Sequence, residues 1–181
     1  MLAAFVAVMG LVSSCGSSKQ VATEETYETP CSGPEYRTDA KTFREKGQGI
    51  AGNEDAARRA ATSSARIALA ESINTTVKAV TDNYVKTYVD GENADTKGRF
   101  EQLGRNVVNQ KLAGSHVICE KYKKSTVNGK NTYTCYIVVE LASEDVLAAL
   151  NNQISNDTKL RTDYDYEKFK KTFEEEMAKM Q

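Results

Sequence analysis

An α+β fold is what this sequence predicts, on three observations. The stretch after residue 53 is rich in Ala and carries apolar residues at three- and four-residue spacing, which is typical of a long helix with one buried side. Two β-prone runs flank Asn128-Gly129, a dipeptide that favours a tight hairpin turn. The last segment is amphipathic. We therefore expect a small antiparallel sheet, a short first strand plus a hairpin, packed against the long helix and further helices, with a C-terminal amphipathic helix.

The chain opens with an apolar run, Leu2 to Val12, that is shorter than the roughly 20 residues of a membrane-spanning helix and matches a signal-peptide core. Directly before Cys15 stand two small residues, and Val12-Ser13-Ser14-Cys15 resembles the lipobox of bacterial lipoproteins. The resemblance implies cleavage after Ser14, lipid on the Cys15 thiol and acylation of the new amino group. The usual Lys or Arg before the apolar run is missing.

These features predict three parts of the chain. Residues 1–14 are a lipoprotein signal peptide, and residues 15–35 are the lipidated cysteine and a flexible polar tether that contains both prolines. Residues 36–181 form a single α+β domain that includes the C-terminal amphipathic helix.

The domain begins with a β-prone piece around Thr42 to Glu45, which we expect to leave through a turn rich in glycine, at Gly47, Gly49 and Gly52. Asn53 then caps the long helix, and Gly91 is its expected stop. Its apolar stripe comprises Ala57, Ala61, Ala65, Leu69, Ile73, Val77, Val80, Tyr84 and Tyr88.

The glycines also match the spacing G-x-G-x-x-G of a dinucleotide-binding turn. That motif requires a βαβ unit with a second parallel strand and an acidic residue about 20 residues further on, and neither follows here. We therefore interpret the turn as structural and expect no nucleotide cofactor.

A second helix is expected from about Thr96 to Leu112, with Gly114 as its stop, followed by the hairpin around Asn128-Gly129. A short helix from Ser143 to Ile154 follows, with Ser143 as its cap. The last helix, Asp163 to Met180, either packs on the domain or recruits a partner. Its apolar stripe comprises Tyr166, Phe169, Phe173, Met177 and Met180.

The order of these elements resembles a known family. A lipobox, a polar tether, a short strand with "GQG" and the Ala/Arg-rich helix with Ala61, Ala65, Arg66, Leu69 and Ala70 are similar to the Lpp-twenty lipoproteins, small envelope proteins of Gram-negative bacteria related to flagellum-associated lipoproteins. The resemblance covers roughly residues 43–150. It implies an α+β domain on an outer-membrane lipid anchor, with no catalytic residues to carry over.

Three cysteines remain once Cys15 is lipidated, in a compartment that favours disulfides. Cys119 and Cys135 share the apolar parity of the hairpin, so they form either a disulfide or a pair of buried thiols if the turn has an odd number of residues or a bulge. A strict two-residue turn places them on opposite faces instead. The role of Cys31 stays open.

Other chemistries find little support. His116 is the sole histidine, which we expect to be buried or capping, and the chain has neither a Cys-x-x-Cys pair nor a G-x-S-x-G elbow, so we expect no metal and no nucleophilic catalysis. The acidic loop from Asp90 to Asp95 lacks the spacing of a calcium loop. With a net charge of −1 we expect no nucleic-acid partner, and we interpret Arg58-Arg59 as part of a solvated face.

The sequence thus predicts a non-enzymatic envelope protein, anchored to the outer membrane by lipid on Cys15, that binds other envelope proteins as an interaction or assembly module. The alternative is a periplasmic module that binds a glycan or a small molecule and regulates a cell-wall enzyme. A deep pocket lined by tyrosines and carboxylates favours the alternative, whereas a smooth surface with an exposed apolar stripe favours the interaction module.

Overall fold

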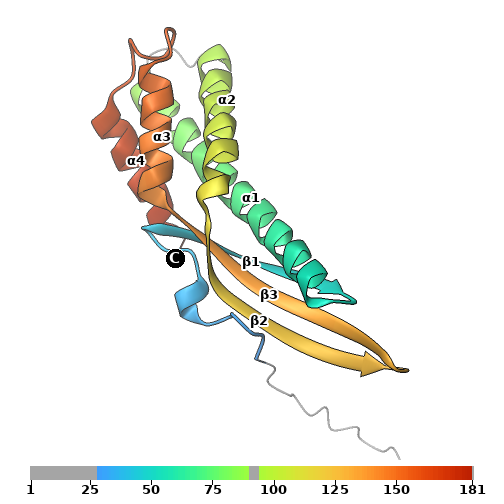
Figure 1. Ribbon diagram of the computed structural model, residues 1–181. Coiled ribbons are helices and arrows are strands. Elements are labelled where there is room, and N and C mark those ends of the chain that lie inside the picture. The colour runs from blue at the N-terminus through green and yellow to red at the C-terminus, as the bar shows by residue number, and fades with distance from the viewer. Residues whose placement is uncertain (1–27, 90–93, 181) are drawn as a thin grey trace, which may run out of the picture.

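A three-stranded antiparallel sheet and one long helix laid across it form the first part of the molecule (Figure 1). The computed structural model describes residues 28–89 and 94–180. The strands are β1 (Thr42–Ala51), β2 (His116–Val127) and β3 (Lys130–Ala142), in the order β1–β3–β2. The long helix is α1 (Glu54–Tyr88). This confirms the predicted α+β class, with an antiparallel sheet packed on a long helix.

The second half of α1 extends past the sheet and joins a helical bundle (Figure 1). The other helices of the bundle are α2 (Ala94–Lys111), α3 (Ser143–Ser155) and α4 (Tyr166–Ala178), and two short 3₁₀ turns, η1 (Pro34–Tyr36) and η2 (Leu112–Gly114), complete the elements. One core runs through both halves, because the stripe predicted on α1 is buried from Ala57 to Tyr84. Only its last member, Tyr88, is exposed.

The predicted glycine turn is wrong, because β1 continues through Gly47 and Gly49 to Ala51. Both glycines face α1. A Cβ atom on Gly47 would lie under 3.0 Å from the backbone of Ala61 and Ala65, and one on Gly49 would do the same to the backbone of Ala57 and Ala61. The glycines therefore serve close packing of α1 on the sheet, and the expected turn shrinks to the residues around Gly52.

The hairpin is the one that Asn128-Gly129 predicts. Both residues have positive φ, 51° and 75°, and Val127 pairs with Lys130 across a two-residue turn. From there the register puts Tyr122 opposite Cys135 and Cys119 opposite Val138, and a bulge follows only between Val117 and Cys119. Cys119 and Cys135 therefore lie on opposite faces of the sheet, as predicted for a strict two-residue turn, and both are buried. The alternative prediction, a disulfide between them, is wrong.

The disulfide joins Cys119 to Cys31 instead, across a Cα–Cα distance of 5.9 Å, while Cys135 is a buried free thiol under α1. Cys31 is itself buried, together with Val138, on the face of the sheet away from α1. Residues that the sequence analysis assigns to the flexible tether are thus part of the folded unit. The signal peptide, Cys15 and the expected stop at Gly91 lie outside the described residues.

Two helix ends were predicted with different success. Asn53 caps α1, since its side-chain oxygen accepts the N–H of Ala56 at 2.9 Å. Ser143 does not cap α3: it is the first residue of that helix, and its N–H donates to the carbonyl of Lys41 at 2.9 Å. This bond ties the start of α3 to the segment before β1.

The last helix packs within the chain. In α4 the side chains of Phe169, Phe173 and Met177 are buried in the same core as α1, and Tyr166 and Met180 are partly buried against it. Of the two roles left open for this stripe, the structure shows packing on the domain.

Candidate functional site

The helix α1 covers β1 and β3 but does not cover β2, whose face on the α1 side is left open (Figure 1). A helix is about 10 Å across and strands are spaced about 4.8 Å apart, so one helix covers roughly two strands. On β2, the side chains that point to the α1 side are Val117, Glu120, Tyr122 and Lys124, and Val117 is 40% exposed. The flank of α1 therefore rises beside the uncovered start of β2, and the two enclose a recess.

This recess is a groove of about 750 Å³, which we call the α1–β2 groove. Its wall is the flank of α1 from Arg58 to Glu71. Its other side is formed by Leu112 and Ala113 of η2 and by Val117. The apolar side chain of Ile67, at 58% exposure, stands in the wall. The groove thus combines exposed apolar groups with cationic ones.

Positive charge dominates the lining. Among the described residues that line the groove, three are arginines, Arg58, Arg59 and Arg66, and one is a carboxylate, Glu71. Arg66 donates from Nε to the hydroxyl of Ser115 at 3.2 Å, so its hydrogen-bond partner is neutral and its charge stays available. The groove is suited to an anionic ligand that also carries apolar groups.

Arg58 is held differently from the other two arginines. Its Nε lies 3.1 Å from Oε2 of Glu120 on β2, and the Tyr122 hydroxyl donates to Oε1 of the same carboxylate at 2.8 Å. The Tyr122 hydrogen bond and the Arg58 guanidinium hold the pKa of Glu120 below its usual value. This carboxylate is ionised at neutral pH and bridges α1 to β2 at one end of the groove.

The free thiol beneath this bridge is not arranged as a nucleophile. Cys135 pairs with Tyr122 across the hairpin and is fully buried under α1. Burial raises the pKa of the Cys135 thiol, which keeps it protonated at neutral pH. A reactive cysteine needs the opposite, a lowered pKa and access to solvent. Cys135 therefore acts as a small apolar core residue.

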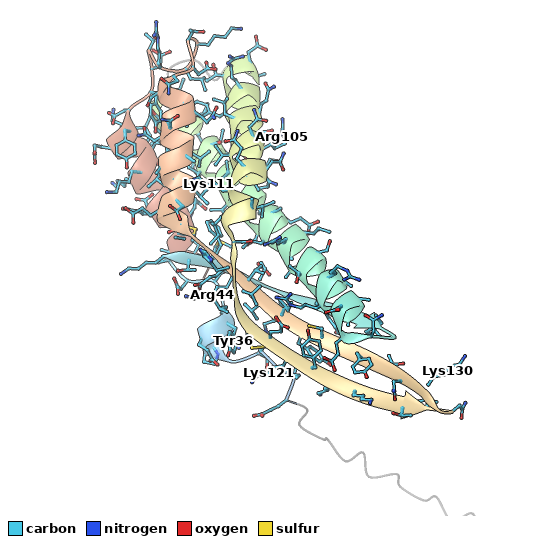
Figure 2. The ribbon with its side chains drawn as sticks, viewed as in Figure 1. Tyr36, Arg44, Arg105, Lys111, Lys121 and Lys130 are labelled. Carbon is cyan, nitrogen blue, oxygen red and sulfur yellow. A yellow bond between two sulfur atoms is a disulfide. The ribbon has the colours of Figure 1, made fainter. Side chains whose placement is uncertain are left out.

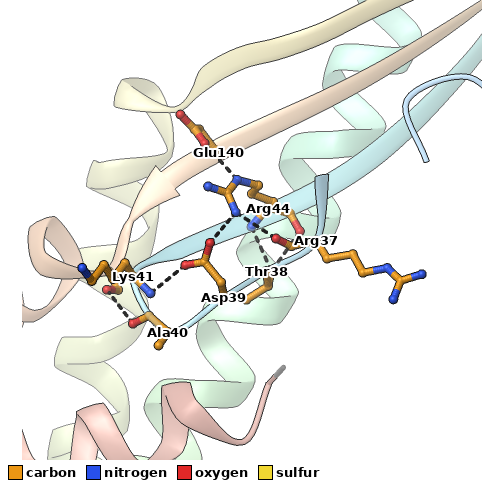
Figure 3. A network of polar contacts seen from close by, with 8 residues as sticks. Arg37, Thr38, Asp39, Ala40, Lys41, Arg44 and Glu140 are labelled. Carbon is orange, nitrogen blue, oxygen red and sulfur yellow. Dashed lines mark hydrogen bonds and ion pairs between the residues drawn. The ribbon is translucent and has the colours of Figure 1, made fainter. Parts of the chain in front are cut away.

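A second hollow, of about 840 Å³, lies between η1, β1 and the end of α4. Tyr36, Glu35 and Glu45 line it, together with residues that form the network drawn in Figure 3. There the guanidinium of Arg44 binds Asp39 at 2.6 Å and Glu140 at 3.0 Å.

The same network fastens the N-terminal segment to the sheet. Thr38 and Arg44 exchange two hydrogen bonds, and Arg44 Nη1 also donates to the carbonyl of Arg37 (Figure 3). The N–H of Lys41 and the Arg44 guanidinium lower the pKa of Asp39. Arg44 and Asp39 therefore hold the N-terminal segment in place, whereas the carboxylates of Glu35 and Glu45 are not part of this network.

The sole histidine lies on the surface, at the edge of the sheet. His116 is the first residue of β2 and is exposed, so the expectation of a buried or capping histidine is wrong. The described residues contain no group of three or more His, Cys, Asp or Glu side chains that could hold a metal ion. None of the helices within residues 28–89 and 94–180 combines the length and the apolar content that a membrane crossing requires.

Sequence reasoning missed the arginines of the groove. It interpreted Arg58-Arg59 as part of a solvated face. Both arginines are exposed, but the sequence did not show that Glu120 on β2 lies beside Arg58. A signal was present: Ile67 is apolar and lies off the buried stripe of α1, one position after Arg66. This signal is weak, because a single exposed apolar residue is common on protein surfaces, and only the fold shows that Val117 lies in the same groove as Ile67.

Comparison with known proteins finds no match to this chain among family models, curated proteins or solved structures. Function therefore has to be inferred from the chain's own residues.

Proposed function

We propose that this chain is a non-enzymatic interaction module of the bacterial cell envelope, anchored to the outer membrane by lipid on Cys15. In this proposal the α1–β2 groove receives a segment of another envelope protein. The observation that carries it is the groove itself, an open recess in which the exposed side chains of Ile67 and Val117 lie beside three arginines. Exposed apolar groups rimmed by polar ones mark interaction sites.

The polar groups next to the groove support binding rather than catalysis. Glu120 is engaged by Arg58 and Tyr122, and the Cys135 thiol is buried with a raised pKa. A general acid or base needs a perturbed group that can reach a substrate, and these groups are committed to partners within the fold.

The anchor rests on the sequence alone. It is supported by the small residues before Cys15 and by the resemblance to the Lpp-twenty lipoproteins. Several acyl chains make a stable anchor, because each buried methylene contributes about 0.8 kcal/mol.

A second candidate function is the binding of a glycan or a small molecule. The hollow beside η1 favours it, since Tyr36 and the carboxylates of Glu35 and Glu45 line that space. Titration of cell-wall glycan fragments into the chain and into its Tyr36→Ala variant tests this role by calorimetry. Binding heat that the variant loses supports it, and no heat with either protein rules it out.

The anchor gives a direct prediction. Cys15→Ser removes the thiol that accepts the lipid, so the chain should leave the membrane fraction or accumulate as an uncleaved precursor. Membrane fractionation with a carbonate wash measures this. A variant that stays with the membranes after the wash, at wild-type size, contradicts the lipid anchor.

The groove is tested by photo-crosslinking in intact cells. A photoreactive amino acid replaces Ile67 in the groove, and the matched control replaces Ile50 on β1, which has a similar exposure of 61% against 58%. Ile50 points away from α1, since the strand alternates and Gly49 faces that helix. Discrete protein adducts at Ile67 that are absent at Ile50 are expected. Equal adducts at both positions, or none at Ile67, contradict the proposed function.

A further inference from the structure

We propose that the occupant of the α1–β2 groove is an acidic amphipathic helix of a partner protein, lying beside α1 over the start of β2. This inference rests on the proposed function, because it names the chemistry of the partner that the groove receives. Three properties of the groove carry it: its shape, its position on the sheet and its charge.

The shape favours a helix. The lining residues of α1 form two rows at four-residue spacing, which run along about 20 Å of its flank; they are Arg58, Thr62, Arg66 and Ala70, and Arg59, Ser63, Ile67 and Glu71. Rows of this spacing are the ridges and grooves that pack against a neighbouring helix. Thr62, Ser63 and Ala70 are small, so a second helix can approach closely. About 13 residues of helix match this length.

The position on the sheet also favours a helix over an added strand. The groove lies above the face of β2, where Val117 contributes its side chain, whereas an added strand would lie beside β2 in the plane of the sheet. Next to the groove, β2 bulges between Val117 and Cys119 in its pairing with β3, and a bulged strand bends, which disfavours regular pairing of a new strand along its free edge. A helix over β2 would complete the layer that α1 begins.

The charge favours an acidic occupant. Arg59 is exposed, and Arg66 binds only a neutral hydroxyl, so both guanidinium groups are available to carboxylates. A second copy of this chain docked by the same groove would bring its own three arginines against these, which disfavours a symmetric dimer through this face. The exposed side chains of Ile67 and Val117 require an apolar ridge between the acidic residues of the partner.

The experiment extends the Ile67 crosslink in intact cells, with the crosslinked site of the partner mapped by mass spectrometry. The probe is the full chain with the photoreactive residue at Ile67, alone or combined with Arg59→Glu and Arg66→Glu. The matched control adds Arg105→Glu, a charge reversal at an exposed position of α2 outside the groove (Figure 2). Thermal melting checks that all variants fold alike.

We expect the adduct to map to an acidic segment of helical periodicity. Its yield should fall at least about fivefold with the Arg59 and Arg66 reversals and stay unchanged with Arg105→Glu, as expected for charge-assisted pairs. Replacing the mapped acidic residues of the partner by Lys should restore the adduct with the reversed groove. Recovery of this kind identifies the charge pairs directly.

Other outcomes overturn the inference. An adduct that maps to a β-strand, to a basic segment, to glycan or to lipid, or one that is insensitive to the arginine reversals, excludes an acidic helix. A protein adduct of that kind leaves the proposed interaction function standing. The absence of any adduct at Ile67 above the Ile50 level rejects both.

Discussion

At the scale of single residues, two glycines set the distance between the layers. Gly47 and Gly49 lie in the middle of β1, and the carbonyls of Ala61 and Ala57 occupy the space that their side chains would need. The Ala residues of α1 that face the strand are fully buried. Small residues on both elements let helix and sheet approach until their backbones are in contact, which is why glycine is used in a strand where it is otherwise unfavourable.

Gly47→Ala is therefore expected to destabilise the fold strongly. The new methyl group meets backbone atoms, which cannot rotate away, so α1 must shift on the sheet at a cost of about 1–3 kcal/mol, the range found for overpacked cores. Gly52→Ala is the control, because no atom lies within 4 Å of its added Cβ. Urea denaturation of both variants measures the difference. Equal stability of the two variants contradicts close packing at Gly47.

A second residue-scale feature is the ion pair that holds the segment after α3. Asp157 is buried, and its Oδ2 accepts from Arg99 Nη2 at 2.6 Å. Its Oδ1 accepts the N–H groups of Lys159 and Leu160. The Arg99 guanidinium and these N–H groups lower the pKa of Asp157 to about 2, from 3.8.

This pair predicts a pH dependence. Because the folded-state pKa is below the unfolded one, the carboxylate contributes stability in full above about pH 4 and loses it as the pH falls towards 2. Asp157→Asn should lower the free energy of unfolding at pH 7 by about 1–3 kcal/mol and should flatten its fall between pH 4 and 2. Urea titrations at several pH values test this. A variant that keeps the wild-type slope shows that other carboxylates cause it.

At the scale of elements, α1 changes character along its length. Over the sheet its buried residues are Ala57, Ala61 and Ala65, while in the bundle they become large, from Leu69 to Tyr84. The Tyr84 ring packs against Phe100 of α2 and Phe169 of α4, and its hydroxyl accepts the N–H of Asp165 at 2.8 Å. The aromatic cluster thus fixes α4 on α1.

The α4 helix gives a prediction at this scale. Phe169→Asp with Phe173→Asp places two carboxylates in the apolar core. The free energy of unfolding should therefore fall by more than the roughly 3–5 kcal/mol of removing one such ring, and the melting temperature should drop sharply. Lys171→Asp, on the exposed side of α4, is the control and should stay within about 0.5 kcal/mol of the wild type. A double variant that melts like the wild type shows that α4 does not contribute to this core.

At the scale of the whole molecule, the N-terminal attachment and the groove use different sides of the sheet. The disulfide between Cys31 and Cys119 and the Arg44 network hold the N-terminal segment on the face away from α1. The α1–β2 groove lies on the face that α1 covers. The described N-terminal residues 28–41 therefore do not line the groove.

The disulfide closes a loop of 88 residues and is expected to stabilise the fold by about 2–4 kcal/mol. Cys31→Ser with Cys119→Ser should lower the free energy of unfolding by that amount, and the melting temperature with it. A reducing agent should destabilise the wild type but not the double variant. Cys135→Ser is the control for thiol chemistry, since this variant must keep its response to the reducing agent. Wild-type protein that is insensitive to reduction contradicts the Cys31–Cys119 bond.

The local elements of this fold could be predicted from the sequence. The spacing of apolar residues along α1 and α4, the cap at Asn53 and the turn at Asn128-Gly129 were all predictable, because helix periodicity, capping and turn conformation depend on residues close together in the chain. These elements were also sufficient for the α+β class.

How distant segments of the chain meet could not be predicted in this way. From the sequence, Gly47 and Gly49 were predicted to form a turn. Glycine is favoured both in turns and where two backbones approach closely, and only the position of α1 shows that close approach is its role here. The partner of Cys119 depends on where residue 31 lies, 88 positions away. The groove arises because one helix is too narrow to cover three strands, which is a property of packed layers and not of any local stretch of sequence.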